Sequence, residues 1–143
     1  MNQTAELLNC VARNALTGED ATAQLIKRTN DSEMRQELTY QQEQYRAVHR
    51  QAEDMLAKMG KDAEAPGPMA KMGMWAGVMM NTAMDKSNAH IADIMIQGAT
   101  MGVVDTTKAR NECADASAEA QGVASSFITQ QQDSIERMKQ FLV

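Results

Sequence analysis

The sequence predicts an all-α protein built as a four-helix bundle, on the strength of three observations. Only two Pro and eight Gly occur among 143 residues, and aromatic residues make up 3%, a composition that favours helix over sheet. Apolar residues recur at spacings of three and four in long stretches, which is typical of amphipathic helices. Short polar turns join the first two stretches and the last two, so each pair is expected to pack antiparallel.

By size the chain is expected to be one domain spanning residues 1–143. The first helix is expected to begin at Thr4, an N-cap residue type, and Gly60 is expected to end the second. Two prolines and a glycine make residues 61–68 a linker. The helices are predicted at about 4–29, 31–59, 69–84, 88–110 and 115–142.

The helix that contains residues 90–104 has Asp93 as its only formal charge there, so it is expected to be buried on most sides. Gly98 and Gly102 lie one turn apart. Each weakens the helix by about 1 kcal/mol relative to Ala. This cost indicates that another backbone comes close to them.

The long connection leaves two topologies open. If the linker and the 69–84 helix, roughly 24 Å long at 1.5 Å per residue, carry the chain back along the bundle, helix 88–110 runs parallel to helix 31–59. That arrangement is a single-crossover bundle. If the connection does not run back along the bundle, the topology is up-and-down. Cys10 and Cys113 would lie at the same end in the first case and at opposite ends in the second. Neither cysteine has a second Cys or His at ligand spacing, so both are expected to be reduced thiols.

This helix plan, with the stretches at residues 88–105 and 133–142, resembles the ferritin-like superfamily, in particular small bacterial ferritin-like domains of unknown function. The resemblance implies a ferritin-like four-helix bundle with a long crossover connection, which here contains an extra short helix. Di-iron sites in such bundles use a carboxylate from each of two helices and Glu-x-x-His from each of the others. This sequence has no Glu-x-x-His. Glu19, Gln41, Tyr45 and Gln131 are therefore interpreted as a mid-bundle polar layer that fixes helix register.

A metal site is the competing interpretation. Glu19 is the carboxylate expected at a ligand position, and Glu43, His49, His90 and Asp93 could complete an atypical iron or manganese site. No Ser or Cys lies in a recognisable nucleophile motif, so no catalytic residue is assigned.

Methionines are concentrated in one part of the chain. Eight of the thirteen lie between Met69 and Met101, and six of these lie in Met69–Met84 around Trp75. Copper(I) binding and ordinary core filling are two interpretations of this segment. A third is a partner surface, since flexible methionines suit adaptable interfaces. We therefore expect a homodimer through the Met69–Met84 region, or another protein partner.

The net charge of −5 and the absence of Lys/Arg clusters argue against nucleic acid and anionic membrane as partners. The N-terminus has no basic region followed by an apolar run, so a cytoplasmic location is expected. The sequence favours a non-catalytic bundle that acts as a structural or protein-interaction module, without a cofactor. The alternative is an atypical iron- or manganese-binding protein or oxidoreductase.

Overall fold

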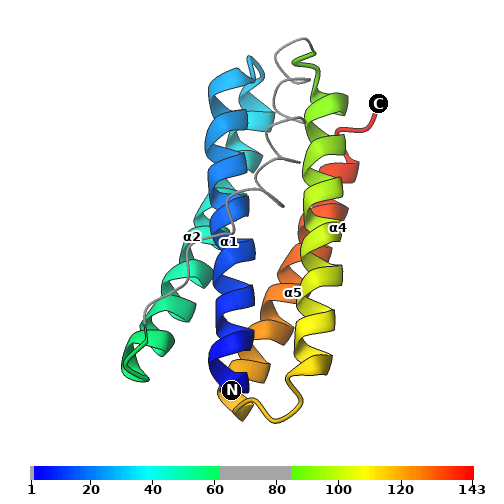
Figure 1. The fold of residues 1–143 in the computed structure, drawn as a ribbon. Coiled ribbons are helices and arrows are strands. Elements are labelled where there is room, and N and C mark those ends of the chain that lie inside the picture. Colours follow the sequence, from blue (N-terminus) through cyan, green and yellow to red (C-terminus); the bar gives the residue numbers. More distant parts are fainter. Residues whose placement is uncertain (1, 62–84) are drawn as a thin grey trace.

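The computed structural model describes residues 2–61 and 85–143. Within these ranges the chain is all-helical: α1 (Gln3–Arg28), α2 (Ser32–Lys58), α4 (Asn88–Glu112) and α5 (Ala118–Lys139). Figure 1 shows α1 packed against α2, and α4 packed against α5, as two antiparallel pairs. The described residues therefore form a four-helix bundle. The predicted linker at 61–68, apart from Lys61, and the predicted helix at 69–84 lie outside them.

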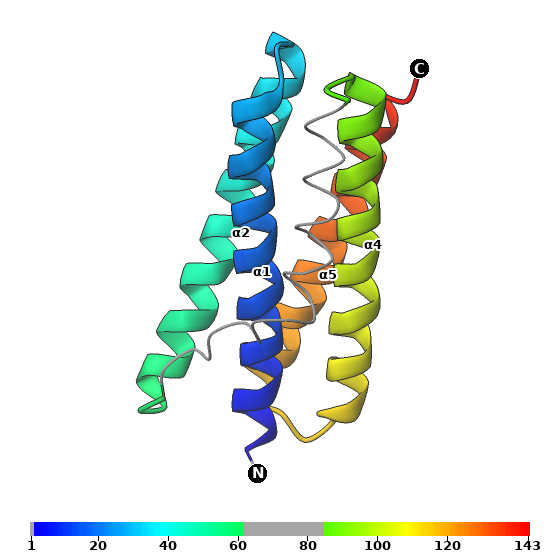
Figure 2. The same ribbon diagram turned by 45° about the horizontal axis from the view of Figure 1, so that its top comes forward.

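The directions of the helices distinguish the two topologies. In Figures 1 and 2, α2 and α4 run one way and α1 and α5 run the other. The N-termini of α1 and α5 are joined directly, because the backbone N–H of Asp115 donates to Gln3 Oε1 (2.8 Å) and that of Ser117 donates to Thr4 Oγ1 (2.8 Å). An up-and-down bundle would place these two ends apart. The helix directions are those of a bundle with one long crossover connection.

The helix ends follow the local sequence with two differences. Asp31 caps α2 and Ser87 caps α4, and both are residue types that favour the N-cap position. Gly60, predicted to end the second helix, adopts the left-handed conformation (φ 73°) after α2. The N-cap of α1 is Asn2 rather than Thr4, because the Thr4 hydroxyl accepts a bond from α5 instead. The last helix begins at Ala118 rather than at 115, since Ser117 is its N-cap.

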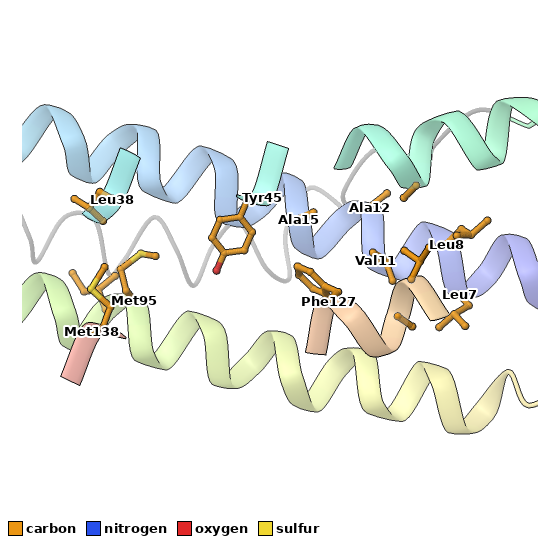
Figure 3. Close-up of a cluster of buried hydrophobic side chains, with 14 of the residues drawn as sticks. Leu7, Leu8, Val11, Ala12, Ala15, Leu38, Tyr45, Met95, Phe127 and Met138 are labelled. Atoms are coloured by element: carbon orange, nitrogen blue, oxygen red, sulfur yellow. The ribbon is translucent and has the colours of Figure 1, made fainter. Parts of the chain in front are cut away.

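The apolar core is one cluster of buried side chains that includes Tyr45 (Figure 3). Each fully buried aliphatic or aromatic side chain contributes about 1.5–3 kcal/mol, so this cluster provides most of the stability. Along α2 and α5 the buried stripes have large apolar residues toward the ends and polar residues in the middle. Figure 3 shows Leu38, Met95 and Met138 to one side of Tyr45, and Leu7, Leu8, Val11, Ala12, Ala15 and Phe127 to the other.

The helix α4 exposes one narrow stripe. Between residues 91 and 104 the exposed positions are Asp93, Gln97, Thr100 and Val104, which are spaced by three and four residues and so lie on one face. The other residues of this stretch are buried or half-buried. The prediction that this helix is buried on most sides is therefore confirmed. Among the described residues, none of the helices has the length and apolarity that crossing a bilayer requires.

Candidate functional site

The centre of the bundle is a layer formed by one residue from each helix: Gly18 of α1, Tyr45 of α2, Gln131 of α5 and Gly102 of α4. We call these four residues the middle layer. The Tyr45 ring lies so close to Gly18 that a Cβ there would overlap its Cδ1, Cε1 and Cζ atoms. The Tyr45 hydroxyl donates to Gln131 Oε1 (2.9 Å), and a Cβ on Gly102 would come within 3.1 Å of that same oxygen. Two large polar side chains thus fill the centre because two glycines leave room for them.

A second set of polar side chains continues from this layer between α2 and α5. Ser134 Oγ donates to Gln41 Oε1 (2.5 Å), and Gln41 Nε2 donates to Glu37 Oε2 (2.9 Å). Glu37, which is 8% exposed, accepts two hydrogen bonds from Arg137, one from Nε and one from Nη2, both at 2.9 Å. The Arg137 guanidinium also lies 4.1 Å from the centroid of the Tyr40 ring. We call the series Ser134–Gln41–Glu37–Arg137 the polar chain. Its buried carboxylate, Glu37, forms a bidentate pair with the Arg137 guanidinium.

The pKa shifts in the middle layer and in the polar chain favour a hydrogen-bonding role over acid–base catalysis. Burial raises the pKa of Tyr45 to about 12, an effect that its bonds with Gln131 and Ser134 partly offset. The phenol is therefore neutral at physiological pH. The hydrogen bonds to Glu37 raise the pKa of Arg137, so this cation is permanent. Gln131 Nε2 is buried without a hydrogen-bond partner among the described residues.

Glu19 lies outside the middle layer, contrary to the sequence-based expectation. Its Oε1 atom is 3.1 Å from Arg46 Nε, and its Oε2 atom is 3.7 Å from His49 Nδ1. Arg46 also pairs with the exposed Glu43 (2.7 Å), and His49 Nε2 is 2.6 Å from Glu53 Oε1. We call these five residues the α1–α2 seam. Successive residues of a helix are rotated by about 100°, so when Gly18 faces the centre, Glu19 faces the seam.

Asp20 adjoins the α1–α2 seam, where its charged form is disfavoured. Its pKa is raised, first by partial burial and then by the nearby charge of Glu19, while His49 acts in the opposite direction. Two neighbouring carboxylates on α1 thus repel each other at the edge of the seam.

His90 and Asp93 lie in the first turns of α4, a different helix from the two that carry the α1–α2 seam. The His90 backbone N–H donates to the capping Ser87 Oγ (3.2 Å), and the exposed Asp93 accepts from Gln97 Nε2 (3.1 Å). Within residues 2–61 and 85–143, no three His, Cys, Asp or Glu side chains are grouped so that they could hold a metal ion. Glu19, Glu43 and His49 come together, but around an arginine.

Both cysteines line one cleft of about 870 Å³ at the end of the bundle where α1 begins. The Cys113 thiol lies 3.4 Å from Glu6 Oε2. Burial, the hydrogen bond to Glu6 and nearby carboxylates raise the pKa of Cys113, so it remains a protonated, weakly nucleophilic thiol. Cys10 Sγ lies 3.7 Å from Asp105 Oδ2. Neither cysteine forms a disulfide.

Three residues of this site were missed by sequence reasoning: Gly18, Glu37 and Arg137. A glycine inside a helix costs stability, so Gly18 could have been recognised as a point of close approach. Glu37 lies four residues before Gln41, a spacing at which helical side chains meet. Nothing in the sequence indicates that Arg137, one hundred residues later, is its partner.

The fold and the middle layer define an all-helical, four-helix-bundle protein with a hydrogen-bonded centre. No family model matches the sequence, and no curated protein matches it either. The fold is similar to a solved crystal structure of a DUF305 fragment from Deinococcus radiodurans, DUF305 being a domain of unknown function. The TM-score is 0.78 at 21% sequence identity, over 99% of this chain and 96% of that chain. This likeness concerns the fold alone.

Proposed function

We propose that this chain is a ferritin-like bundle in which protein side chains occupy the place of a metal centre, and that it acts as a cytoplasmic structural or protein-interaction module. The observation that carries this proposal is the middle layer. The Tyr45 ring and the Gln131 amide converge on the axis from α2 and α5, while α1 and α4 contribute glycines.

The chemistry of that layer supports a structural role. Two metal ions in such a bundle need several anionic oxygen ligands that converge from the four helices. Here the converging groups are a neutral phenol and a neutral amide that already bond to each other at 2.9 Å. Glu37, the one buried carboxylate within residues 2–61 and 85–143, is engaged by Arg137 and Gln41. An ion entering the centre would have to displace bonds without gaining an anionic ligand.

Elemental analysis of the protein purified from its native host tests this proposal. We expect iron and manganese well below one atom per chain. A Gln131→Glu/Gly102→Ala double variant serves as a matched control. Gln131→Glu adds a carboxylate to the middle layer, and Gly102→Ala reduces the space beside that carboxylate. Stoichiometric iron or manganese in the natural protein, retained after dialysis against a chelator, would overturn the proposal.

The competing function, an atypical iron- or manganese-binding protein or oxidoreductase, has one favourable observation. Glu19 and His49 lie side by side on adjacent helices, with Glu43 and Glu53 one step further out. Arg46 between them supplies a positive charge that repels cations. If metal is found, an Arg46→Ala variant that binds more of it would locate the site at the α1–α2 seam.

For the interaction role we propose a homodimer through Met69–Met84, with another protein partner as the other outcome. The support is compositional, since six methionines and the single tryptophan lie in that segment and adaptable apolar faces suit interfaces. Sedimentation velocity at micromolar concentration should show a dimer. Met80→Glu should shift the population to monomer, whereas the exposed α5 substitution Gln132→Glu should not. A monomer for the unaltered chain would contradict self-association.

A further inference from the structure

A pocket of about 290 Å³ lies between α1 and α4 and reaches the middle layer. We call it the α1–α4 pocket. Three residues of its lining on α4, Thr100, Val104 and Lys108, are exposed and mark its mouth. Its floor consists of buried residues, which include Gly18, Ala21, Tyr45, Met95, Ala99 and Gln131.

The size and the apolar floor of the pocket suit a small molecule. Protein pockets that hold small ligands start at about 300 Å³ and are lined mainly by apolar groups, with a few polar groups that orient the ligand. The α1–α4 pocket is at the lower end of that range. A molecule with one ring and a short substituent is therefore the size that it can enclose.

Most polar side chains of the lining already have partners in the protein. Asn14 Nδ2 donates to Asp105 Oδ2 (2.8 Å), Thr17 Oγ1 donates to the Arg13 carbonyl (2.9 Å), and Thr100 Oγ1 donates to the Ile96 carbonyl (2.8 Å). These bonds stabilise the two helices. They leave these groups little capacity to orient a ligand.

Gln131 is the exception on the floor. Its Oε1 atom accepts the Tyr45 hydroxyl at 2.9 Å, whereas its Nε2 atom has no hydrogen-bond partner among the described residues. Gln131 is 2% exposed, so bulk solvent does not supply the missing acceptor. A buried donor without a partner is unfavourable, and the bond at Oε1 polarises the amide and strengthens its N–H groups as donors. The floor therefore lacks one hydrogen-bond acceptor.

The charges around the pocket favour a neutral ligand. Asp105 and Lys108 have opposite charges, and the Tyr45 phenol on the floor is neutral. A charged ligand would lose its hydration on an apolar floor without gaining a counter-ion there.

We propose that the α1–α4 pocket binds a small, neutral, mainly apolar molecule that has one carbonyl-type acceptor. Its apolar part contacts Met95, Ala99 and Ala21, and its carbonyl oxygen accepts a hydrogen bond from Gln131 Nε2. This binding site goes beyond the proposed structural role and does not rest on it, because metal content and ligand binding are measured separately.

Three probes of similar size and shape test the proposal on the full, ¹⁵N-labelled chain. Acetophenone has a neutral carbonyl, isopropylbenzene has a methyl group in place of the carbonyl oxygen, and benzoate has a charged carboxylate. We expect acetophenone to bind saturably, with a Kd on the order of millimolar, and to shift the Gln131 side-chain amide proton downfield in NMR spectra. Isopropylbenzene should bind without that shift, and benzoate should bind much more weakly than acetophenone.

The variant Tyr45→Phe/Gln131→Leu separates the hydrogen bond from the apolar contacts. It removes the hydroxyl and the amide together at nearly constant shape, so neither is left as a buried orphan. It should bind isopropylbenzene as the natural chain does. Its affinity for acetophenone relative to isopropylbenzene should fall by about 3- to 10-fold, the value of one hydrogen bond.

Ala21→Leu adds bulk to the floor and should abolish binding of both neutral probes. Gly122→Leu is its matched control, because Gly122 is on α5 with nothing within 4 Å of an added Cβ, and it should bind both probes normally. Circular dichroism reports whether each variant keeps its helices. The proposal is overturned if acetophenone does not bind saturably, as for a pocket that holds water alone. It is also overturned if acetophenone binds without shifting the Gln131 amide, or if the double variant keeps the natural ratio of affinities.

Discussion

The interface between α2 and α5 and the α1–α2 seam both contain a glutamate paired with an arginine, but in different surroundings. Glu37 is 8% exposed and accepts two bonds from Arg137 and one from Gln41. Glu19 is 20% exposed and shares Arg46 with Glu43. Arg137 makes both of its hydrogen bonds to the one carboxylate of Glu37, whereas Arg46 divides its hydrogen bonds between two carboxylates and solvent competes for them. We therefore expect the same residue pair to contribute more to stability where its carboxylate is buried than at the edge of the bundle.

Removing each arginine tests this difference directly. Arg137→Ala leaves a buried carboxylate without its cation, and breaking such a pair costs about 3–5 kcal/mol; the partly exposed arginine places the loss near the lower end. Arg46→Ala should cost less than about 1 kcal/mol, as for exposed ion pairs. Urea unfolding monitored by circular dichroism measures both. Equal losses would mean that the two regions do not differ in the way proposed.

Arg137→Lys sharpens the result, because it keeps the charge and removes the planar fork. It should recover part of the stability that Arg137→Ala loses. Full recovery would show that charge alone, without two-pronged geometry, accounts for the pairing of Glu37.

The packing of the middle layer predicts the next largest effect. Gly18→Ala forces a Cβ into the Tyr45 ring and should destabilise the chain by about 1–3 kcal/mol, as overpacking does. Gly122→Ala, in open space on α5, should instead stabilise it by about 0.5–1 kcal/mol. Thermal unfolding of both variants measures the contrast. Tyr45→Leu should rescue Gly18→Ala, and a stabilising Gly18→Ala would refute the close contact.

Tyr45→Phe tests the hydrogen bond of that layer. It leaves the buried Gln131 Oε1 without its donor, at a cost of about 1–3 kcal/mol. Tyr40→Phe, at the exposed second tyrosine, should cost little. Equal stabilities of the two variants in urea would argue against the Tyr45–Gln131 bond.

The pKa of Tyr45 adds a pH dependence to this test. Because it is raised from 10.0 to about 12 in the folded chain, the folded state holds the phenolic proton more tightly than the unfolded state. The corresponding stability is complete below pH 10 and is lost as pH rises toward 12, at about 1.4 kcal/mol per pH unit. The Tyr45→Phe variant should show a shallower loss over that range.

The four described helices follow from patterns that each helix carries by itself. The residues of α5 that are buried between Ala120 and Met138 recur at spacings of three and four, since a helix must turn one face to the core. The polar middle was also predictable, because Gln41, Tyr45 and Gln131 interrupt otherwise apolar stripes. The caps at Asp31 and Ser87 depend only on neighbouring residues.

What could not be predicted is which residue of one helix meets which residue of another. Glu19 and Gly18 differ by one position, and a rotation of about 100° decides which of them faces the axis. That rotation is set by the Tyr45 ring, which needs a glycine opposite it. The pairing of Glu37 with Arg137 similarly depends on the relative heights of α2 and α5. Periodicity places residues on faces, but contacts across helices determine their partners.

The smallest expected effect concerns the edge of the seam. Because the pKa of Asp20 is raised by partial burial and by Glu19, its charged form is disfavoured in the folded chain, and the stability linked to its protonated form is lost as pH rises through the folded pKa. Asp20→Asn removes this cost and should stabilise the chain at neutral pH by no more than about 0.5 kcal/mol. The gain should vanish below the ordinary pKa of 3.8, where Asp20 is neutral in both states. Urea unfolding at several pH values measures it, with the exposed Asp54→Asn as control. A loss of stability at neutral pH would mean that Asp20 is a favourable member of the seam, and the contrast with the fully matched Glu37 would then disappear.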